Sequence, residues 1–526
     1  MSARMSLPVR VRWCEHLEMK RPNVLLLCAL SLCMTGCAVG PNYHAPKTVA
    51  PPEFLAASTP AAKVSTTTQA PIDLASWWHS FNDPELDSLI DRAIQANPDL
   101  EIALTRLQEV RTGEAVLVGN VLPMVAASAA AGRGTGSDMT RAGAASALRA
   151  ADNKGSLDQI EQVAGFAATW ELDLFGGGRR AIEAGKYDIE AAAAARNAVL
   201  ISIVADVARN YVDMRGMQMR LAIIRENIAT AQQSRDFEQA RFDRGLTNEL
   251  DFQLATRELA TLQSELPPLQ SDIQAAEYDI AVLLGQYPEN LAAELTKPGT
   301  LPALPESVEA GLPLDLLQRR PDVRQAERQL AAATARIGVA TANLFPHVML
   351  SGGLGTQSAG IGAQGTHIWA FGPTVYWPLL DFGTLDALVS IADLQAHEQF
   401  LAYKKTVIDA VQDADTAIAR FQAQEQRLKS LTDAIDASQR AVELAQQRYD
   451  RGLTDFLNVV DAERQQYNLE DQYTASQQSA ADAFIYLYKA LGGGWESYQE
   501  IPAIRRPEPA VMASFHRLLF SDDPQK

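Results

Sequence analysis

The sequence predicts a membrane protein of mixed α and β class, in which long coiled-coil helices join a few membrane-spanning β-strands. The first observation is an internal tandem repeat, because "ARFDRGLTNELDFQLATR" at 240–257 returns as "QRYDRGLTDFLNVVDAER" at 447–464. The second is a run of apolar residues at alternating spacings of four and three, which indicates coiled-coil helices. The third is a pair of short segments in each copy with apolar residues at every second position, as in β-strands.

Composition excludes several classes of protein before any element is placed. The 526 residues carry a net charge of −18 without a basic cluster, so nucleic acid is not expected as a partner. The cysteines all lie in the first 37 residues, at Cys14, Cys28, Cys33 and Cys37. The body of the chain therefore has neither a disulfide framework nor a thiolate metal site.

The N-terminus predicts export. From Met19 the chain runs "MKRPNVLLLCALSLCMTGC", in which two basic residues precede an apolar stretch too short to span a bilayer. Residues 1–36 therefore read as a cleaved signal peptide, with Met1 or Met19 as the start. The residues before Cys37 resemble a bacterial lipobox, which implies a lipid on Cys37 and a lipid-anchored segment 37–71; an ordinary secretory signal is the alternative. Ala38 in place of an aspartate favours outer-membrane sorting.

The repeat extends over most of the mature chain. Gly245 and Gly452 are 207 residues apart, and upstream the offset becomes 223, as between Pro123 and Pro346. The first copy thus carries 16 extra residues (223 minus 207) after Pro123, in a Gly/Ala/Ser-rich stretch that predicts a loop. Further matches at the offset of 207 join Trp170, Phe175 and Leu284-Gly285 to Trp377, Phe382 and Leu491-Gly492.

Each copy is expected to begin with a helix of about 25 residues that ends near the proline. A β-hairpin follows, at about 121–175 and 344–382. Its alternating apolar residues are Ala168, Trp170, Leu172 and Leu174 in the first copy and Trp369, Phe371, Val375, Trp377 and Leu379 in the second. Strands of about ten residues with one apolar face suit a membrane barrel. The pattern by itself equally allows a soluble hairpin.

A long helical hairpin completes each copy. The four-three stripe is Leu200, Val204, Val207, Tyr211, Met214, Leu221 and Ile228 in the first copy and Val407, Val411, Ala414, Ile418, Phe421, Leu428 and Ile435 in the second. A helix over about 180–243 would be roughly 95 Å long. Gly245 and Gly452 are expected to end these helices, with Thr247 and Thr454 capping the returning ones. Pro267 and Pro268 predict a kink or break in the first return helix.

Strands in lipid would force several chains to associate. Two strands per copy give four per chain, and four strands cannot close into a barrel. Because an open sheet edge is not tolerated in lipid, chains must pool their strands into a barrel of about eight, twelve or sixteen.

The chain resembles the outer-membrane factor family of the TolC/OprM/NodT group, the exit ducts of tripartite exporters. The resemblance rests on "CAVGPNY", "WWHSFNDPELDSLIDRAIQANPDL", "LPLDLLQRRPDV", the two "RGLT" stretches and "LYKALGGGW". It implies a homotrimer with a twelve-stranded outer-membrane barrel, a periplasmic α-helical barrel and an equatorial domain. The expected parts are repeat 1 at 72–285, a linker at 286–320, repeat 2 at 321–492 and a C-terminal tail at 493–526, with equatorial segments at 72–97, 286–320 and in the tail.

The resemblance also implies functional residues at the hairpin tips. The periplasmic gate would use Asp251, Tyr449, Thr454, Asn458 and Asp461. Contact with a periplasmic membrane-fusion adaptor would involve Arg244, Gly245, Leu246 and Thr247, with Arg451, Gly452, Leu453 and Thr454. Asn458 stands where a relative has an aspartate, and Thr454 where the family has an arginine. The alternative to a gate role for Asp461 is that it lies on a solvated helix face. The alternative to adaptor contact for the tip residues is that they only form the turn.

The expected function is an outer-membrane exit duct that extends into the periplasm and passes small toxic molecules from an inner-membrane pump. That pump would be of the resistance-nodulation-division or major facilitator type. The alternatives are a structural coiled-coil lipoprotein without a bore and a passive porin. The chain has no HExxH, GxSxG or Walker-type loop, so neither an enzyme nor a metal or cofactor site is expected. The sequence does not indicate the substrate.

Overall fold

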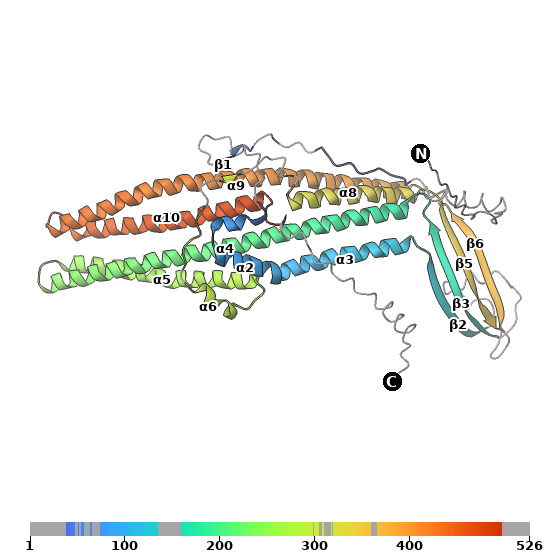
Figure 1. Ribbon diagram of the computed structural model, residues 1–526, viewed down its shortest axis with the longest axis horizontal. Coiled ribbons are helices and arrows are strands. Elements are labelled where there is room, and N and C mark those ends of the chain that lie inside the picture. Colours follow the sequence, from blue (N-terminus) through green and yellow to red (C-terminus); the bar gives the residue numbers. More distant parts are fainter. Residues whose placement is uncertain are drawn as a thin grey trace, which may run out of the picture. The chain divides into compact units, whose positions relative to one another are not determined.

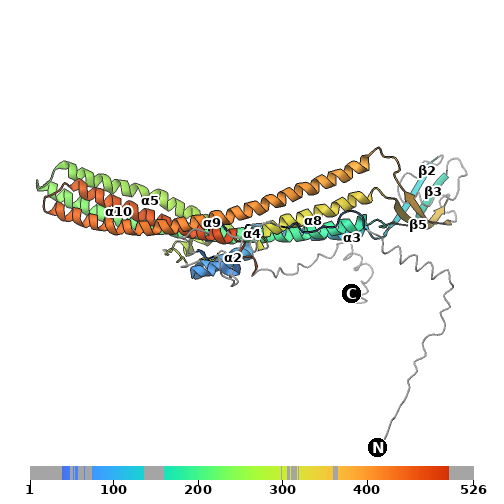
Figure 2. The ribbon, with the colours of Figure 1, turned by 90° about the horizontal axis from the view of Figure 1, so that it is seen from above.

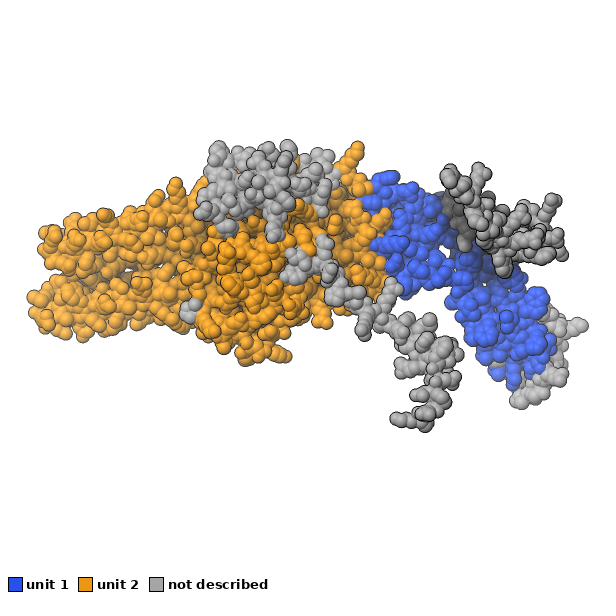
Figure 3. Space-filling view, viewed as in Figure 1, with its two compact units in different colours: residues 1–44, 113–186, 331–398 blue, residues 45–112, 187–330, 399–526 orange. Residues whose placement is uncertain are grey.

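The computed structural model describes most of the chain from residue 38 onward. The described residues are 38–47, 51, 54–56, 64–65, 74–134, 159–297, 299–304, 308–309, 317, 319–358 and 365–496. The predicted signal peptide, Cys37, most of the expected loop in the first copy and the tail beyond 496 lie outside them. The chain forms two compact units (Figure 3). Unit 1 comprises residues 1–44, 113–186 and 331–398, and unit 2 comprises 45–112, 187–330 and 399–526, so each unit draws on both sequence copies.

Unit 1 contains one four-stranded antiparallel sheet. Its strands are β2 (Met124–Gly134), β3 (Gln159–Leu172), β5 (His347–Ser358) and β6 (Thr366–Tyr376), in the order β2-β3-β5-β6 (Figure 1). Each copy supplies one hairpin, and β3 pairs with β5 to join them. The mixed α and β class is confirmed. Strands of 11 to 14 residues are long enough to cross a bilayer when tilted.

The two faces of the sheet differ in chemistry. Directly paired residues share a face, and one row across it is Ala127, Phe166, Leu354 and Trp369. Val125, Phe371 and Val375 lie on that same face, and their side chains are largely exposed. The opposite face carries small and polar residues, as in the row Thr169, Ser351 and Gly372. An apolar face beside a small polar face is the pattern of a strand between lipid and a water-filled bore.

The long helices reproduce the sequence offset. Helices α4 (Gly177–Asp243) and α9 (Thr384–Asp450) have 67 residues each, and α5 (Glu249–Leu283) and α10 (Phe456–Ala490) have 35. The first and last residues of α9 and α10 lie 207 residues after those of α4 and α5, as with Gly177 and Thr384. The hairpins α4–α5 and α9–α10 lie side by side (Figures 1 and 2), and α5 contacts α10. Helices α3 (Pro98–Asn120) and α8 (Pro321–Ala342) precede the strands.

Of the kink or break predicted for the first return helix, the break is wrong. Helix α5 continues through Pro267 and Pro268, although two backbone donors are missing there. Leu262 and Leu269, on either side of the prolines, are buried in the main core. This packing holds the helix together across the defect.

The core of unit 2 is built around tryptophans from the segment that precedes the helices. The 3-10 helix η2 (Leu74–Phe81) and α2 (Pro84–Ala96) lead into it, and Asp83 caps α2 by accepting from the backbone N–H groups of Glu85 and Leu86. Trp77 stacks on Tyr488 at 5.5 Å between ring centres, and Phe81 meets Phe484 at 5.1 Å. Unit 2 also contains four short elements. They are η4 (Pro288–Asn290), α6 (Ala292–Leu295) and the parallel strands β1 (Val64–Ser65) and β4 (Val308–Glu309).

Within the described residues one helix, α4, is long and apolar enough to span a membrane. More than half of its apolar window is buried inside the chain, because Leu200, Val204 and Val207 belong to the main core. This helix is therefore a core helix by its packing.

Candidate functional site: the helical hairpin tips

Both outgoing helices end in the same backbone motif. Gly245 and Gly452 adopt φ values of 69° and 68°, a left-handed conformation that favours glycine. The N–H of Leu246 bonds to the carbonyl of Arg241 at 2.9 Å, and the N–H of Leu453 bonds to that of Arg448 at 2.8 Å. These six-to-one bonds satisfy the last carbonyls of each helix. Gly245 and Gly452 are therefore required by the turn itself.

The predicted capping role of the tip threonines is wrong. The N-cap of α5 is Asn248, whose side chain accepts from the N–H of Asp251 at 3.0 Å. The N-cap of α10 is Asp455, which makes no side-chain capping bond. Helix α5 begins at Glu249, so its N-cap position is one residue after Thr247, and Thr247 instead donates to the Asp251 carboxylate at 2.6 Å.

The tips expose apolar side chains in matched pairs. Leu246 and Leu453 are 66% and 63% exposed, and Leu250 and Leu457, one turn further on, are also exposed. Arg244 and Arg451 stand beside them at the surface. Because the turn uses only the backbone of the residue after glycine, these leucines are free to contact a partner helix.

Tyr449 joins the two hairpins just above the tips. Its hydroxyl, on α9, donates to Glu238 Oε1, on α4, at 2.8 Å, and both side chains are buried. The Arg241 guanidinium lies 4.9 Å from the centre of the Tyr449 ring. Burial raises the pKa of Glu238, while the Tyr449 hydrogen bond and Arg241 oppose that shift. Burial, the bond to Glu238 and the nearby Asp251 charge raise the pKa of Tyr449.

Three of the remaining predicted gate residues form bonds within their own hairpin. Asn458 Nδ2 donates to Thr454 Oγ1 at 2.8 Å, and Asp461 accepts from Arg464 at 2.6 Å, both pairs being exposed. The structure therefore brings Asp251 into electrostatic range of Tyr449 and leaves Thr454, Asn458 and Asp461 bonded within their own hairpin.

Sequence reasoning missed Glu238 and Arg241. Glu238 lies outside the four-three stripe of its helix, where an acidic residue normally faces water. A signal was available in the repeat, because Glu238 matches Ala445 and Tyr449 matches Phe242 at the offset of 207. Glu238 and Tyr449 each differ in residue type from the matching position in the other copy, so this hydrogen bond can form only once per chain.

Further polar contacts join the hairpins above the tips. Tyr467 on α10 donates to Glu265 on α5, and Arg220 on α4 pairs with Asp471 on α10 at 2.6 Å. Gln478 donates to Asp213 on α4. Asp482 lies beside Asp213, and burial followed by that like charge raises the pKa of Asp482 to about 7, while Arg209 opposes the shift.

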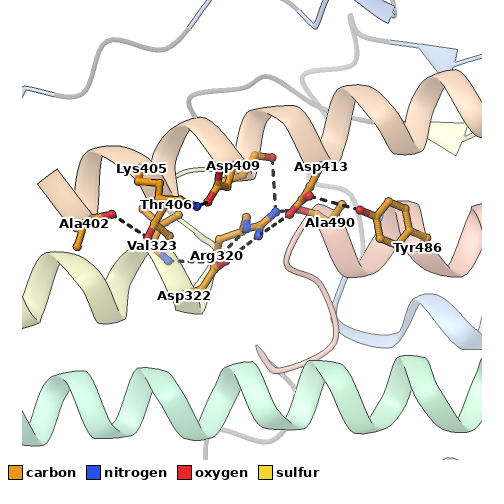
Figure 4. Close-up of polar contacts among 11 residues, drawn as sticks. Arg320, Asp322, Val323, Ala402, Lys405, Thr406, Asp409, Asp413, Tyr486 and Ala490 are labelled. Carbon is orange, nitrogen blue, oxygen red and sulfur yellow. Dashed lines mark hydrogen bonds and ion pairs between the residues drawn. The ribbon is translucent and has the colours of Figure 1, made fainter.

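The base of the second hairpin is held by Arg320. Figure 4 shows its guanidinium between Asp322 and Asp413, with bonds of 2.6 and 3.2 Å. It also donates to the carbonyl of Ala490, the last residue of α10, at 3.0 Å. In the first copy Asn97 occupies the matching position, 223 residues earlier, and donates to the carbonyl of Leu283 at 2.7 Å. Both copies thus tie the end of the return helix to the start of a short helix.

The tips provide ion pairs, hydrogen bonds and exposed apolar side chains. Among the residues that the structure describes, no group of three or more His, Cys, Asp or Glu side chains could hold a metal ion. The arrangement can hold two helical hairpins together and present charge and apolar surface at their ends.

Comparison with known proteins gives consistent matches over nearly the whole chain. The family model "Outer membrane efflux protein" matches residues 89–286 and 312–493. Nodulation protein T of Rhizobium leguminosarum bv. viciae is 29% identical over 490 residues, covering 92% of this chain and 96% of that protein. The antibiotic efflux pump outer membrane protein ArpC of Pseudomonas putida is 30% identical over 485 residues, covering 90% and 96%. The outer-membrane channel OprN is 34% identical, with a TM-score of 0.78 over 87% of this chain and 100% of that one.

Proposed function

Because the chain belongs to the outer membrane efflux protein family, we propose that it is the outer-membrane exit duct of a tripartite export system. Three chains close one twelve-stranded barrel, and their long helices form the periplasmic tube. The observation that carries this function is the open sheet of four strands with one apolar face and one small polar face, since such a sheet needs sibling strands in lipid. The family and its fold are those of channels rather than enzymes.

The partners follow from the family. A periplasmic adaptor docks on the exposed tip leucines and arginines of the 244–247 and 451–454 turns, and an inner-membrane pump supplies the energy. The similar protein ArpC serves antibiotic efflux, and TtgC of Pseudomonas putida serves toluene efflux. Small toxic molecules are accordingly the proposed cargo. The pump is of the resistance-nodulation-division or major facilitator type.

The gate works by separating the two hairpins of each chain. In the closed form Tyr449 holds α9 to α4 through Glu238, and the Arg220–Asp471 pair holds α10 to α4. An adaptor that binds the open form better shifts the equilibrium toward it. Asp251 adds charge beside Tyr449, and Thr454, Asn458 and Asp461 line the mouth, where a ring of three Asp461 carboxylates favours cations.

Lipid on Cys37 anchors the mature chain to the outer membrane. The residue lies outside the described part, and the proposal rests on the lipobox-like sequence that precedes it. A single lipid-bearing residue per chain gives three anchors per trimer, which together hold firmly even where one acyl chain would not.

Purified trimer in a planar bilayer tests the function. We expect discrete single-channel steps whose open probability rises when the adaptor is added. An ordered trimer without conductance would instead identify a structural coiled-coil lipoprotein. Steady large conductance with no response to adaptor would identify a passive porin. Palmitate labelling of the wild-type chain, absent from Cys37→Ser, tests the lipid separately.

A further inference from the structure

The residues that directly follow Cys37 are docked against the turn between β3 and α4. We call residues 38–42 the N-terminal strap. The N–H of Val39 bonds to the carbonyl of Phe175 at 3.0 Å. A Cβ atom at Gly176 would lie 2.6 Å from the Cα of Ala38, and one at Gly40 would lie 2.4 Å from the Cα of Gly338. Backbone therefore meets backbone at distances that only glycine permits.

Arg180 fastens the strap with a buried guanidinium. The residue is 4% exposed, in the first turn of α4. Its Nε donates to the carbonyl of Val39 at 3.1 Å, and its Nη2 donates to the carbonyl of Gly40 at 3.2 Å and to Asn42 Oδ1 at 2.7 Å. Its Nη1 pairs with Glu183 at 2.8 Å. Three of these four bonds end on the strap, so the buried charge is satisfied mainly by that segment.

The second copy of the same turn shows that the turn alone needs no strap. Gly383 has φ 85°, close to the 82° of Gly176, but a Cβ there would meet nothing within 4 Å. Phe382 is 91% exposed, whereas its counterpart Phe175 stacks on Phe345 at 4.6 Å. The positions that match Arg180 and Gly338 are Ala387 and Ala115. The arginine and the glycine therefore occur only in the copy that holds the strap.

We infer that the N-terminal strap is a latch that fixes the lipid-bearing end of the chain to the end of β3, with Arg180 as the positioning residue. The inference rests on the proposed acylation of Cys37. Ala38, the residue after Cys37 in the sequence, lies against Gly176, which is four residues after the last residue of β3. The lipid anchor and the strand consequently enter the membrane at one place, and the anchor helps to deliver the strand to the bilayer.

Hydrogen exchange of the full-length acylated protein in detergent tests the docking. Arg180→Gln removes the three bonds to the strap, and Gly338→Ala places a methyl group 2.8 Å from Arg180 Cγ and 2.9 Å from the carbonyl of Val39. Alanine favours a helix over glycine, so Gly338→Ala damages the strap without weakening α8 itself. We expect exchange in residues 38–42 to become at least about tenfold faster in both variants. Lys186→Gln is the control, because Lys186 is an exposed basic residue on the same helix.

The yield of heat-resistant trimer in the outer membrane tests the positioning role. We expect Arg180→Gln and Gly338→Ala to lower that yield severalfold while palmitate labelling stays unchanged. In a Cys37→Ser chain, exported by an ordinary signal peptide, Arg180→Gln should add no further loss, because the lipid to be positioned is gone. An equal loss in both backgrounds would make Arg180 merely structural and overturn the inference.

Other outcomes are also decisive. Unchanged exchange in both variants would show that the strap is not held by Arg180. Faster exchange with an unchanged trimer yield would show that the latch does not position the anchor. A wild-type chain without palmitate would overturn the lipid anchor of the proposed function, while the exchange experiment would still decide whether the strap is docked.

Discussion

Outside the four-three stripe, several matched positions of the two long helices are buried in one copy of the repeat and exposed in the other. Ile201 on α4 is 6% exposed, whereas its counterpart Ile408 on α9 is 57% exposed. Ala184 and Ala194 are likewise buried, while their counterparts Ile391 and Leu401 are about half exposed. The larger apolar side chains therefore stand on the copy that leaves them uncovered.

This difference shows what one chain lacks. Helix α8 packs against both long helices, since Arg328 pairs with Glu190 on α4 at 2.9 Å and Ile337 lies in a buried cluster with Ala392 of α9. The positions of α9 that stay exposed, such as Ile408, need a neighbour from another chain, as do the edge strands β2 and β6. A head-to-tail contact of this kind closes into a ring, which is how three incomplete chains form one tube.

The largest expected effect comes from charging the two matched isoleucines. Ile408→Asp should leave a folded monomer and abolish the trimer, because its side chain faces a sibling chain. Ile201→Asp should instead destabilise the chain itself by about 4 kcal/mol or more, since it buries an unpaired charge. Light scattering on detergent-solubilised protein and thermal unfolding followed by circular dichroism separate the outcomes. A trimeric Ile408→Asp would show that Ile408 does not lie in an interface between chains.

A second change makes the tip of one copy resemble that of the other. Tyr449→Phe gives position 449 the same residue type as the matching Phe242. It removes the hydroxyl that donates to the buried Glu238, which should destabilise the closed form by about 1–3 kcal/mol. We expect a higher open probability in single-channel recordings. Glu238→Ala, which restores the residue at Ala445, should act in the same direction. The double variant should open little more than either single one; fully additive effects would contradict a shared bond.

The contact between the hairpins at Asp482 is expected to depend on pH. The pKa of Asp482 is raised to about 7 in the folded chain, so the folded state binds a proton more readily than the unfolded one. Stability from this group is therefore greatest below the unfolded pKa of about 4 and is lost as pH rises through about 7. Asp482→Asn should stabilise the protein by about 2 kcal/mol at pH 8 and flatten this dependence. Unfolding midpoints of the wild type and the variant from pH 5 to 8 test this prediction. A variant whose midpoint falls with pH as steeply as that of the wild type would refute it.

The smallest expected effect concerns ion selectivity. Asp461 has Leu254 as its counterpart, so the charge occurs once per chain. Asp461→Ala should lower the cation-to-anion permeability ratio by about twofold, because one ring of three carboxylates is lost. Reversal potentials in a salt gradient measure this ratio. An unchanged ratio would place Asp461 on a solvated helix face instead.

Much of the fold could be predicted because periodicity and repetition are local properties of the chain. The four-three stripe and the two glycines predict α4 and α9, and the alternating aromatic residues predict β6. The candidate site was predictable only where it depends on the turn, as at Gly245. Glu238 was not, because its burial depends on a tyrosine 211 residues away.

The duplicated plan, the lengths of the helices and strands and the need for sibling chains follow from the order of residues alone, since these depend on spacing along one polymer. The packing of the folded chain set what spacing cannot express. It carried α5 through two prolines because Leu262 and Leu269 are packed on either side of them. It covered Ile201 on α4 and left the matching Ile408 on α9 exposed, and it placed the strap under Arg180 in one copy alone. Each of these outcomes depends on which surfaces meet in space, and two nearly identical stretches of sequence meet different surfaces.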